Sequence, residues 1–107
     1  MTAFVQLAHV LVFSTFLGYI GIWKDKMPAF MYTVILIFGI VIILYHIFKA
    51  FYKKDSWINL IHILLVGPIL VYIGFMKKET PFKAFEIVLM LAFASLGYHG
   101  YYLLKEL

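Results

Sequence analysis

The residues with the clearest capacity for chemistry are the four histidines, His9, His46, His62 and His99. Each lies in a different long uncharged stretch, and each is close to the same end of its stretch if successive stretches run in opposite directions. In helices that rise 1.5 Å per residue, all four imidazoles would lie about 8–9 Å inside one face. Neutral imidazole binds Zn, Cu, Fe and Ni, and its titration near neutral pH suits proton transfer. The spacing therefore predicts a shared histidine layer.

The stretches that carry the histidines are long and apolar. The chain has 107 residues, of which 65% are hydrophobic and 13% are charged, and its mean hydropathy is +1.02. Soluble domains carry about 25% charged residues. About 20 apolar residues cross a bilayer as a helix, which satisfies its own backbone hydrogen bonds. We predict an all-α, multi-pass integral membrane protein with spans at about residues 3–22, 28–51, 57–76 and 81–104.

The predicted spans are joined by connections of only a few residues. Short connections make consecutive helices antiparallel neighbours, so residues 1–107 are expected to form a single membrane domain, a four-transmembrane-helix bundle. Pro28 and Pro81 fall in the first turns of the second and fourth spans, where a missing N–H costs little. Lysines are spread nearly evenly between the two faces, so the orientation and the identity of the membrane stay open.

The sequence also resembles itself after a shift of 53 residues. All four histidines are at identical positions. The identical pairs include His9 with His62, His46 with His99, Tyr45 with Tyr98, Gly21 with Gly74, and Pro28 with Pro81. Self-similarity at a fixed offset indicates duplication of one structural unit. We predict two tandem, parallel repeats of a two-helix hairpin, at residues 1–53 and 54–107.

Small residues lie on the same helical face as two of the histidines. Ser95 and Ala92 precede His99 by one and two turns, and Gly39 precedes His46 by two turns. Small residues let helices approach closely in a membrane, so this face is expected to point into the bundle. Four inward imidazoles would then reach one central ion at roughly 2.0–2.1 Å per bond.

Three functions fit a histidine layer. The favoured one is binding of a transition metal (Zn, Cu or Fe) or of haem b, in a redox or metal-handling role without a predicted catalytic residue. The first alternative is a proton or ion channel, formed by a homo-oligomer, in which the histidines gate the pore. The second is a structural or assembly protein whose His–His or His–Tyr hydrogen bonds tie helices together. Direct contact within Tyr45-His46 or Tyr98-His99 is not expected, because adjacent helical residues point to different faces.

Two further features stand out from the apolar background. Glu86 is the one acidic residue inside a predicted span, where it either reaches the lipid headgroups or attracts cations to a mouth opposite the histidines. Gly67-Pro68 interrupts the third span, and proline is expected to kink it and to free the carbonyl of Leu64. That carbonyl either accepts a hydrogen bond from the nearby imidazole of His62 or is shielded by neighbouring side chains. Because the first repeat has Ser14-Thr15 there, the kink would break the symmetry of the repeats.

Composition limits the partners. The sequence has no Cys, which excludes disulfides and thiolate metal sites, and all nine basic residues are Lys. Without Arg, recognition of nucleic acid is not expected, and the lipid bilayer is the expected partner. The segments Leu64-Leu65-Val66-Gly67-Pro68 and Tyr72-Ile73-Gly74, with Tyr45-His46 or Tyr98-His99 near a helix end, resemble small four-span membrane proteins predicted in large DNA viruses of algae and protists. This resemblance implies a membrane location and no particular activity.

Overall fold

The computed structural model describes residues 3–52 and 56–106, and every element in these two ranges is helical. Two of the elements, η1 and η3, are π-helical, and η2 and η4 are 3-10 turns. In chain order the elements are α1 (Ala3–Ala8), η1 (His9–Phe13), α2 (Ser14–Trp23), η2 (Lys24–Lys26), α3 (Ala29–Tyr52), α4 (Ser56–Ile61), η3 (His62–Val66), α5 (Gly67–Met76), η4 (Lys77–Glu79) and α6 (Phe82–Glu106).

The short elements join into long helices. Within the described residues, four helices are long and apolar enough to cross a membrane: Ala3–Lys26, Ala29–Tyr52, Trp57–Glu79 and Phe82–Glu106. The prediction of four long apolar helices is therefore confirmed. The helices α3 and α6 begin directly after Pro28 and Pro81, whose carbonyls accept hydrogen bonds from the N–H groups of Met31 and Ala84.

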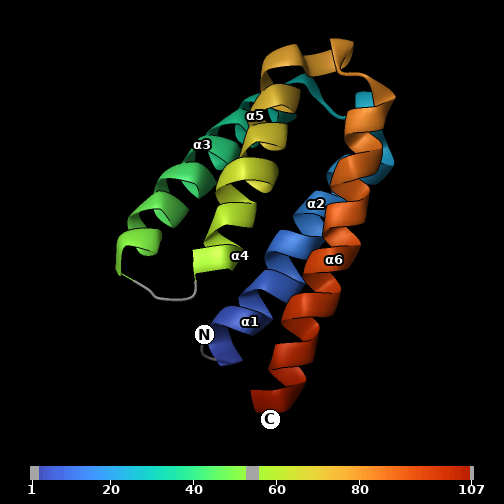
Figure 1. The fold of residues 1–107 in the computed structure, drawn as a ribbon. Helices are drawn as coiled ribbons and strands as arrows, with labels where there is room; N and C mark the ends of the chain where they lie inside the picture. Colours follow the sequence, from blue (N-terminus) through green and yellow to red (C-terminus); the bar gives the residue numbers. More distant parts are fainter. Residues whose placement is uncertain (1–2, 53–55, 107) are drawn as a thin grey trace. The chain divides into compact units, whose positions relative to one another are not determined.

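The helices fall into two compact units. The first contains Met1–Lys24 and Phe85–Leu107, so it pairs α1, η1 and α2 with most of α6. The second contains Asp25–Ala84, which pairs α3 with α4, η3 and α5. In each unit the two long helices run side by side (Figure 1).

Glycines set the closest approach between the two helices of each unit. A Cβ added at Gly21 would lie 2.6 Å from the Cβ of Leu89 in the first unit. In the second unit, a Cβ added at Gly74 would lie 2.6 Å from the Cβ of Leu36. Real Cβ atoms do not approach so closely, so the helix backbones touch at these points only because both residues are glycine.

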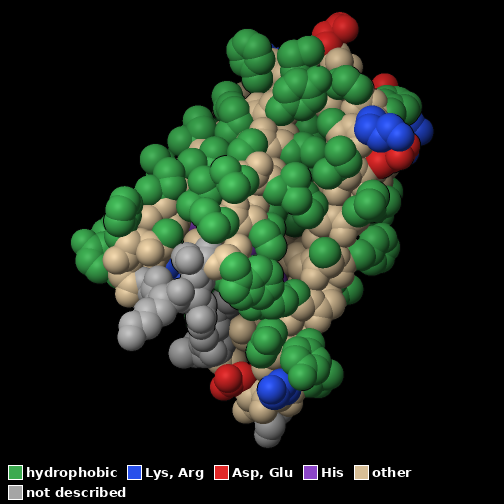
Figure 2. Space-filling model, in the orientation of Figure 1, with side chains coloured by type: hydrophobic (Ala, Val, Ile, Leu, Met, Phe, Trp, Pro, Cys, Tyr) green, Lys and Arg blue, Asp and Glu red, His purple; other side chains and the backbone are tan. Residues whose placement is uncertain are grey.

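Hydrophobic side chains cover the outer surfaces of the helices. The most exposed large ones include Phe4, Phe51, Leu64, Phe75 and Leu104, each with more than two thirds of its surface accessible. On the face drawn in Figure 2, green hydrophobic side chains run along the helices, whereas lysine and acidic side chains gather at helix ends. This distribution of side chains is compatible with helices that face lipid.

Candidate functional site

Two of the histidines begin the π-helical segments. His9 opens η1 and His62 opens η3. The Nδ1–H of His9 donates to the carbonyl of Val5, one turn back, at 2.8 Å. The Nδ1–H of His62 donates in the same way to the carbonyl of Ile58, also at 2.8 Å. Each ring is therefore held against its own helix by a backbone acceptor.

The other two histidines bond to a side-chain amide of the neighbouring helix. The Nδ1–H of His99 on α6 donates to Oε1 of Gln6 on α1 at 2.6 Å. The Nδ1–H of His46 on α3 donates to Oδ1 of Asn59 on α4 at 2.9 Å. All four side chains are more than nine-tenths buried, and Asn59 is fully so. An amide buried in an apolar environment is costly unless it is hydrogen-bonded, and these bonds meet that need.

The histidines of each unit stack on one another. The ring centroids of His9 and His99 are 4.2 Å apart with 30° between the ring planes. Those of His46 and His62 are 4.1 Å apart with 22° between the planes. We call these the first and second histidine pairs. The structure thus brings the four predicted residues together as two pairs, while convergence of all four on one point stays a prediction.

The hydrogen bonds fix the tautomer of each neutral ring. Because Nδ1 carries the proton that is donated to an oxygen, the lone pair of each imidazole lies on Nε2. Metal-binding histidines have this arrangement, in which the nitrogen that does not bind the metal donates to a carbonyl or other oxygen and thereby orients the ring. The chemistry of the donor set therefore fits a transition metal better than a hard cation, which prefers oxygen ligands.

The pair geometry does not favour haem between the two rings of a pair. Axial imidazoles of haem point at the iron from opposite sides, so their centroids are roughly 6 Å apart with bonds of about 2.0–2.1 Å. The rings of His9 and His99 are stacked at 4.2 Å and leave no space for a macrocycle between them. Haem b and the channel gate stay predictions without a geometric feature that supports them.

The expectation that the rings within Tyr45-His46 and within Tyr98-His99 do not touch is wrong. Tyr45 and His46 do touch, edge to face, with centroids 5.1 Å apart, and Tyr98 and His99 do so at 5.0 Å. Adjacent residues diverge at Cβ, but rings of this size reach back across the helix surface.

At Gly67-Pro68 the acceptor for His62 and the form of the helix differ from the expected ones. The acceptor of the His62 Nδ1–H is Ile58 and not Leu64. The distortion is a π-helical turn that ends where Gly67 donates its N–H to the carbonyl of His62. The same turn occurs at His9–Phe13, where no proline follows. Proline is therefore not required for such a turn, while the kink and the loss of symmetry expected at this point stay predictions.

The remaining site candidates have simpler surroundings. Ser95 accepts a hydrogen bond from the hydroxyl of Ser14 at 2.9 Å within the first unit. Glu86 is exposed, and both roles expected for it stay predictions. Sequence analysis missed Gln6 and Asn59 as site residues. Their signal was present, because the two amides align in the repeat and lie in otherwise apolar segments.

Comparison of the chain with protein-family models, with curated proteins and with solved structures finds no match.

Proposed function

We propose that this protein is a multi-pass integral membrane protein, built as a four-helix bundle by tandem duplication, that binds a transition metal ion through its histidine pairs. The observation that carries the proposal is the recurrence of one arrangement in both units: two stacked imidazoles, each with its Nδ1–H donated to an oxygen. This arrangement directs the lone pairs of both rings to Nε2, the atom that binds metals.

Duplication is supported by details that recur 53 residues apart. Lys24 and Lys77 both end a helix with φ of 54°, and the π-helical turns begin at His9 and His62. The histidine contacts agree with the same offset of 53 residues. Exchanging each residue for its counterpart in the other repeat replaces His9 by His62 and His99 by His46, so the first histidine pair becomes the second. Features that do not depend on apolar composition thus repeat together, as one copied unit requires.

Metal binding needs only small movements in the first histidine pair. Ligand nitrogen atoms of His9 and His99 lie within 4.8 Å of each other. In a tetrahedral site with bonds of about 2.0–2.1 Å, ligand nitrogen atoms are about 3.4 Å apart. Rotation of the two side chains that brings the nitrogen atoms closer by up to about 1.4 Å closes this gap. Each pair then supplies two ligands to an ion.

The test is the metal content of protein purified in detergent after growth with Zn, Cu and Fe supplied separately. We expect near-stoichiometric retention of one of these metals, and its loss in the double variant His46→Ala with His99→Ala. The matched control is Tyr45→Phe with Tyr98→Phe, which changes the neighbouring residues and keeps the metal. One ion per chain would indicate a shared four-histidine layer, and two would indicate one site per pair. Wild-type protein that stays metal-free after loading with all three ions would refute metal binding.

A structural role is the second candidate, because the bonds of His99 to Gln6 and of His46 to Asn59 each join two helices. Interhelical hydrogen bonds in membranes contribute about 0.6 kcal/mol on average and up to about 1–2 kcal/mol. A purely structural histidine predicts that His99→Ala lowers stability equally with and without added metal. Metal binding predicts that added metal raises the stability of wild-type protein alone.

A further inference from the structure

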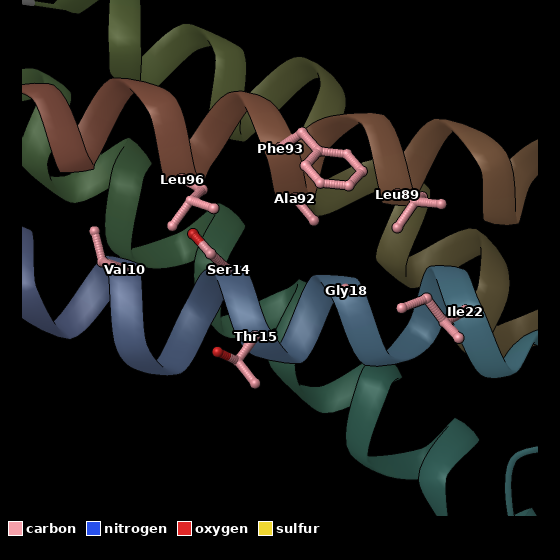
Figure 3. Close-up of a pocket in the computed structure, with 9 residues that line it drawn as sticks. All are labelled: Val10, Ser14, Thr15, Gly18, Ile22, Leu89, Ala92, Phe93 and Leu96. Atoms are coloured by element: carbon pink, nitrogen blue, oxygen red, sulfur yellow. The ribbon is translucent and has the colours of Figure 1, made fainter.

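The first unit contains an apolar groove. It has a volume of about 210 Å³ and lies between the helix of α1, η1 and α2 and helix α6. Figure 3 shows its lining, with Gly18 in the middle of one wall and Ala92 opposite. Val10 and Ile22 mark its two ends. At 1.5 Å per residue these ends are about 18 Å apart along the helix, close to the thickness of one leaflet's hydrocarbon, about 15 Å.

Two positions at which the repeats differ line the groove. The shift of 53 residues aligns Gly18 with Val71 and Ala92 with Gly39. In the second unit Val71 packs so closely on Gly39 that a Cβ added there would lie 3.0 Å from Cγ2 of the valine. In the first unit, a Cβ added at Gly18 would meet only the Cβ of Ala92, at 4.0 Å. The space that Gly18 leaves open in the first unit is thus filled by a valine side chain at the matching position of the second unit.

The groove suits an apolar ligand. Of its two polar lining residues, Thr15 points away from α6 (Figure 3), and Ser14 is bonded to Ser95. The wall facing it is formed by Leu89, Ala92 and Leu96, so a charged or sugar group would lose its hydration without replacement. Apolar cavities of about 150 Å³ bind molecules such as benzene, so about 210 Å³ holds a somewhat longer hydrocarbon segment. A helix, about 10 Å across, does not fit.

We propose that this groove binds one acyl chain of a membrane lipid. Ile22 and Leu96 in its lining are exposed, so the groove is open to the medium around the first unit. The end at Ile22 is followed directly by Trp23 and Lys24, an aromatic ring and a cation. These residue types contact lipid headgroups, so a chain in the groove would have its anionic or zwitterionic headgroup beside them. The proposal rests on the membrane location proposed above.

The test uses the protein in vesicles of phosphatidylcholine and phosphatidylglycerol that contain a small fraction of phosphatidylcholine with a photoactivatable acyl chain. After illumination and proteolysis, mass spectrometry locates the adducts. We expect them on the groove residues of α2 and α6, reduced about fivefold by Gly18→Val, which adds three carbon groups to the groove. Gly97→Val is the matched control on α6, where an added Cβ meets no atom within 4 Å, and it keeps the labelling. Ala92→Leu fills the groove from the other wall and should repeat the loss.

The outcomes separate this proposal from the proposed function. Equal labelling of wild-type protein, Gly18→Val and Ala92→Leu, or adducts spread evenly over all exposed helix surfaces, would refute the groove as a lipid site. A protein cross-linker added to the same vesicles tests whether a second copy of the chain occupies the groove instead. Cross-linked dimers that form in wild-type protein and are lost in Gly18→Val, with unchanged lipid labelling, would refute the proposal and identify that second copy as the occupant. Metal content measured on the same samples reports on the histidine pairs independently. Protein released from the vesicles by alkaline extraction would overturn the membrane location itself.

Discussion

Substituting alanine for Gly74 tests the helix contact on which the second unit depends. The added Cβ would lie 2.6 Å from the Cβ of Leu36 and 2.7 Å from its Cα and backbone N. Because two of these atoms are backbone, no side-chain rotation relieves the clash and the helices must separate. Overpacking of this kind costs about 1–3 kcal/mol. The gain from replacing a helical glycine by alanine is about 0.8–1.0 kcal/mol, so the net effect is a destabilisation of up to about 2 kcal/mol.

The matched control is Gly97→Ala, where an added Cβ has no atom within 4 Å and only the gain of about 0.8–1.0 kcal/mol applies. Unfolding by sodium dodecyl sulfate in mixed micelles, followed by circular dichroism, gives both free energies of unfolding. Gly74→Ala should be less stable than Gly97→Ala by about 1–3 kcal/mol, the overpacking cost alone. Gly21→Ala should match Gly74→Ala, because a Cβ there meets Leu89 at the same 2.6 Å. A Gly74→Ala protein as stable as Gly97→Ala would refute the close contact.

Three further predictions concern the site and its helices. Metal occupancy after dialysis should fall as the pH is lowered from about 7.5 to about 5, since protonation of Nε2 removes the lone pair that binds the ion; a flat profile would exclude imidazole ligands. Ser95→Ala removes the bond to Ser14 and should lower the free energy of unfolding by about 0.5–1.5 kcal/mol in the same detergent titration. Pro68→Ala should keep the π-helical turn at His62–Val66, because the turn at His9–Phe13 forms without proline; backbone chemical shifts that indicate a regular α-helix in this variant would contradict that inference.

The helices were predictable from the sequence because the features that define them lie along the chain and do not depend on contacts with other helices. Uncharged stretches of bilayer length, bounded by lysine clusters and by Pro28 and Pro81, determine where each helix lies without knowledge of its neighbours. The small residues on the same helical face as His46 and His99 were informative for the same reason. Gly39 was expected at a helix contact, and it packs on Leu70 and Val71.

The local details of the site were not predictable in the same way. The role of Gln6 and Asn59 depends on which side chain faces which imidazole across two helices, and spacing along one helix does not supply this. The edge contact of Tyr98 with His99 depends on side-chain rotation. The π-helical turns have no sequence marker of their own, since one is followed by Gly67-Pro68 and the other by Ser14-Thr15.

The amide partners offer a last test, because the two units use different residues for the same bond. Gln6 is longer than Asn59 by one methylene, and its Oε1 lies 2.6 Å from Nδ1 of His99. In Gln6→Asn the side chain is shorter by one C–C bond, about 1.5 Å, so the acceptor would fall short and the hydrogen bond would be lost or lengthened. Losing the partner of a buried imidazole N–H costs about 1–3 kcal/mol.

The reverse change, Asn59→Gln, lowers stability through overpacking and not through loss of a hydrogen bond. Asn59 is fully buried, so Asn59→Gln adds a methylene to a filled site, at a cost of about 1–3 kcal/mol from overpacking. Gln6→Asn should therefore shift the Nδ1–H resonance of His99 toward that of a weaker hydrogen bond, whereas Asn59→Gln should keep the hydrogen bond of His46 while lowering stability. If both variants kept the imidazole resonances and the free energy of unfolding of the wild type, the amides would not be the partners that hold the rings, and the tautomer argument for metal binding would lose its basis.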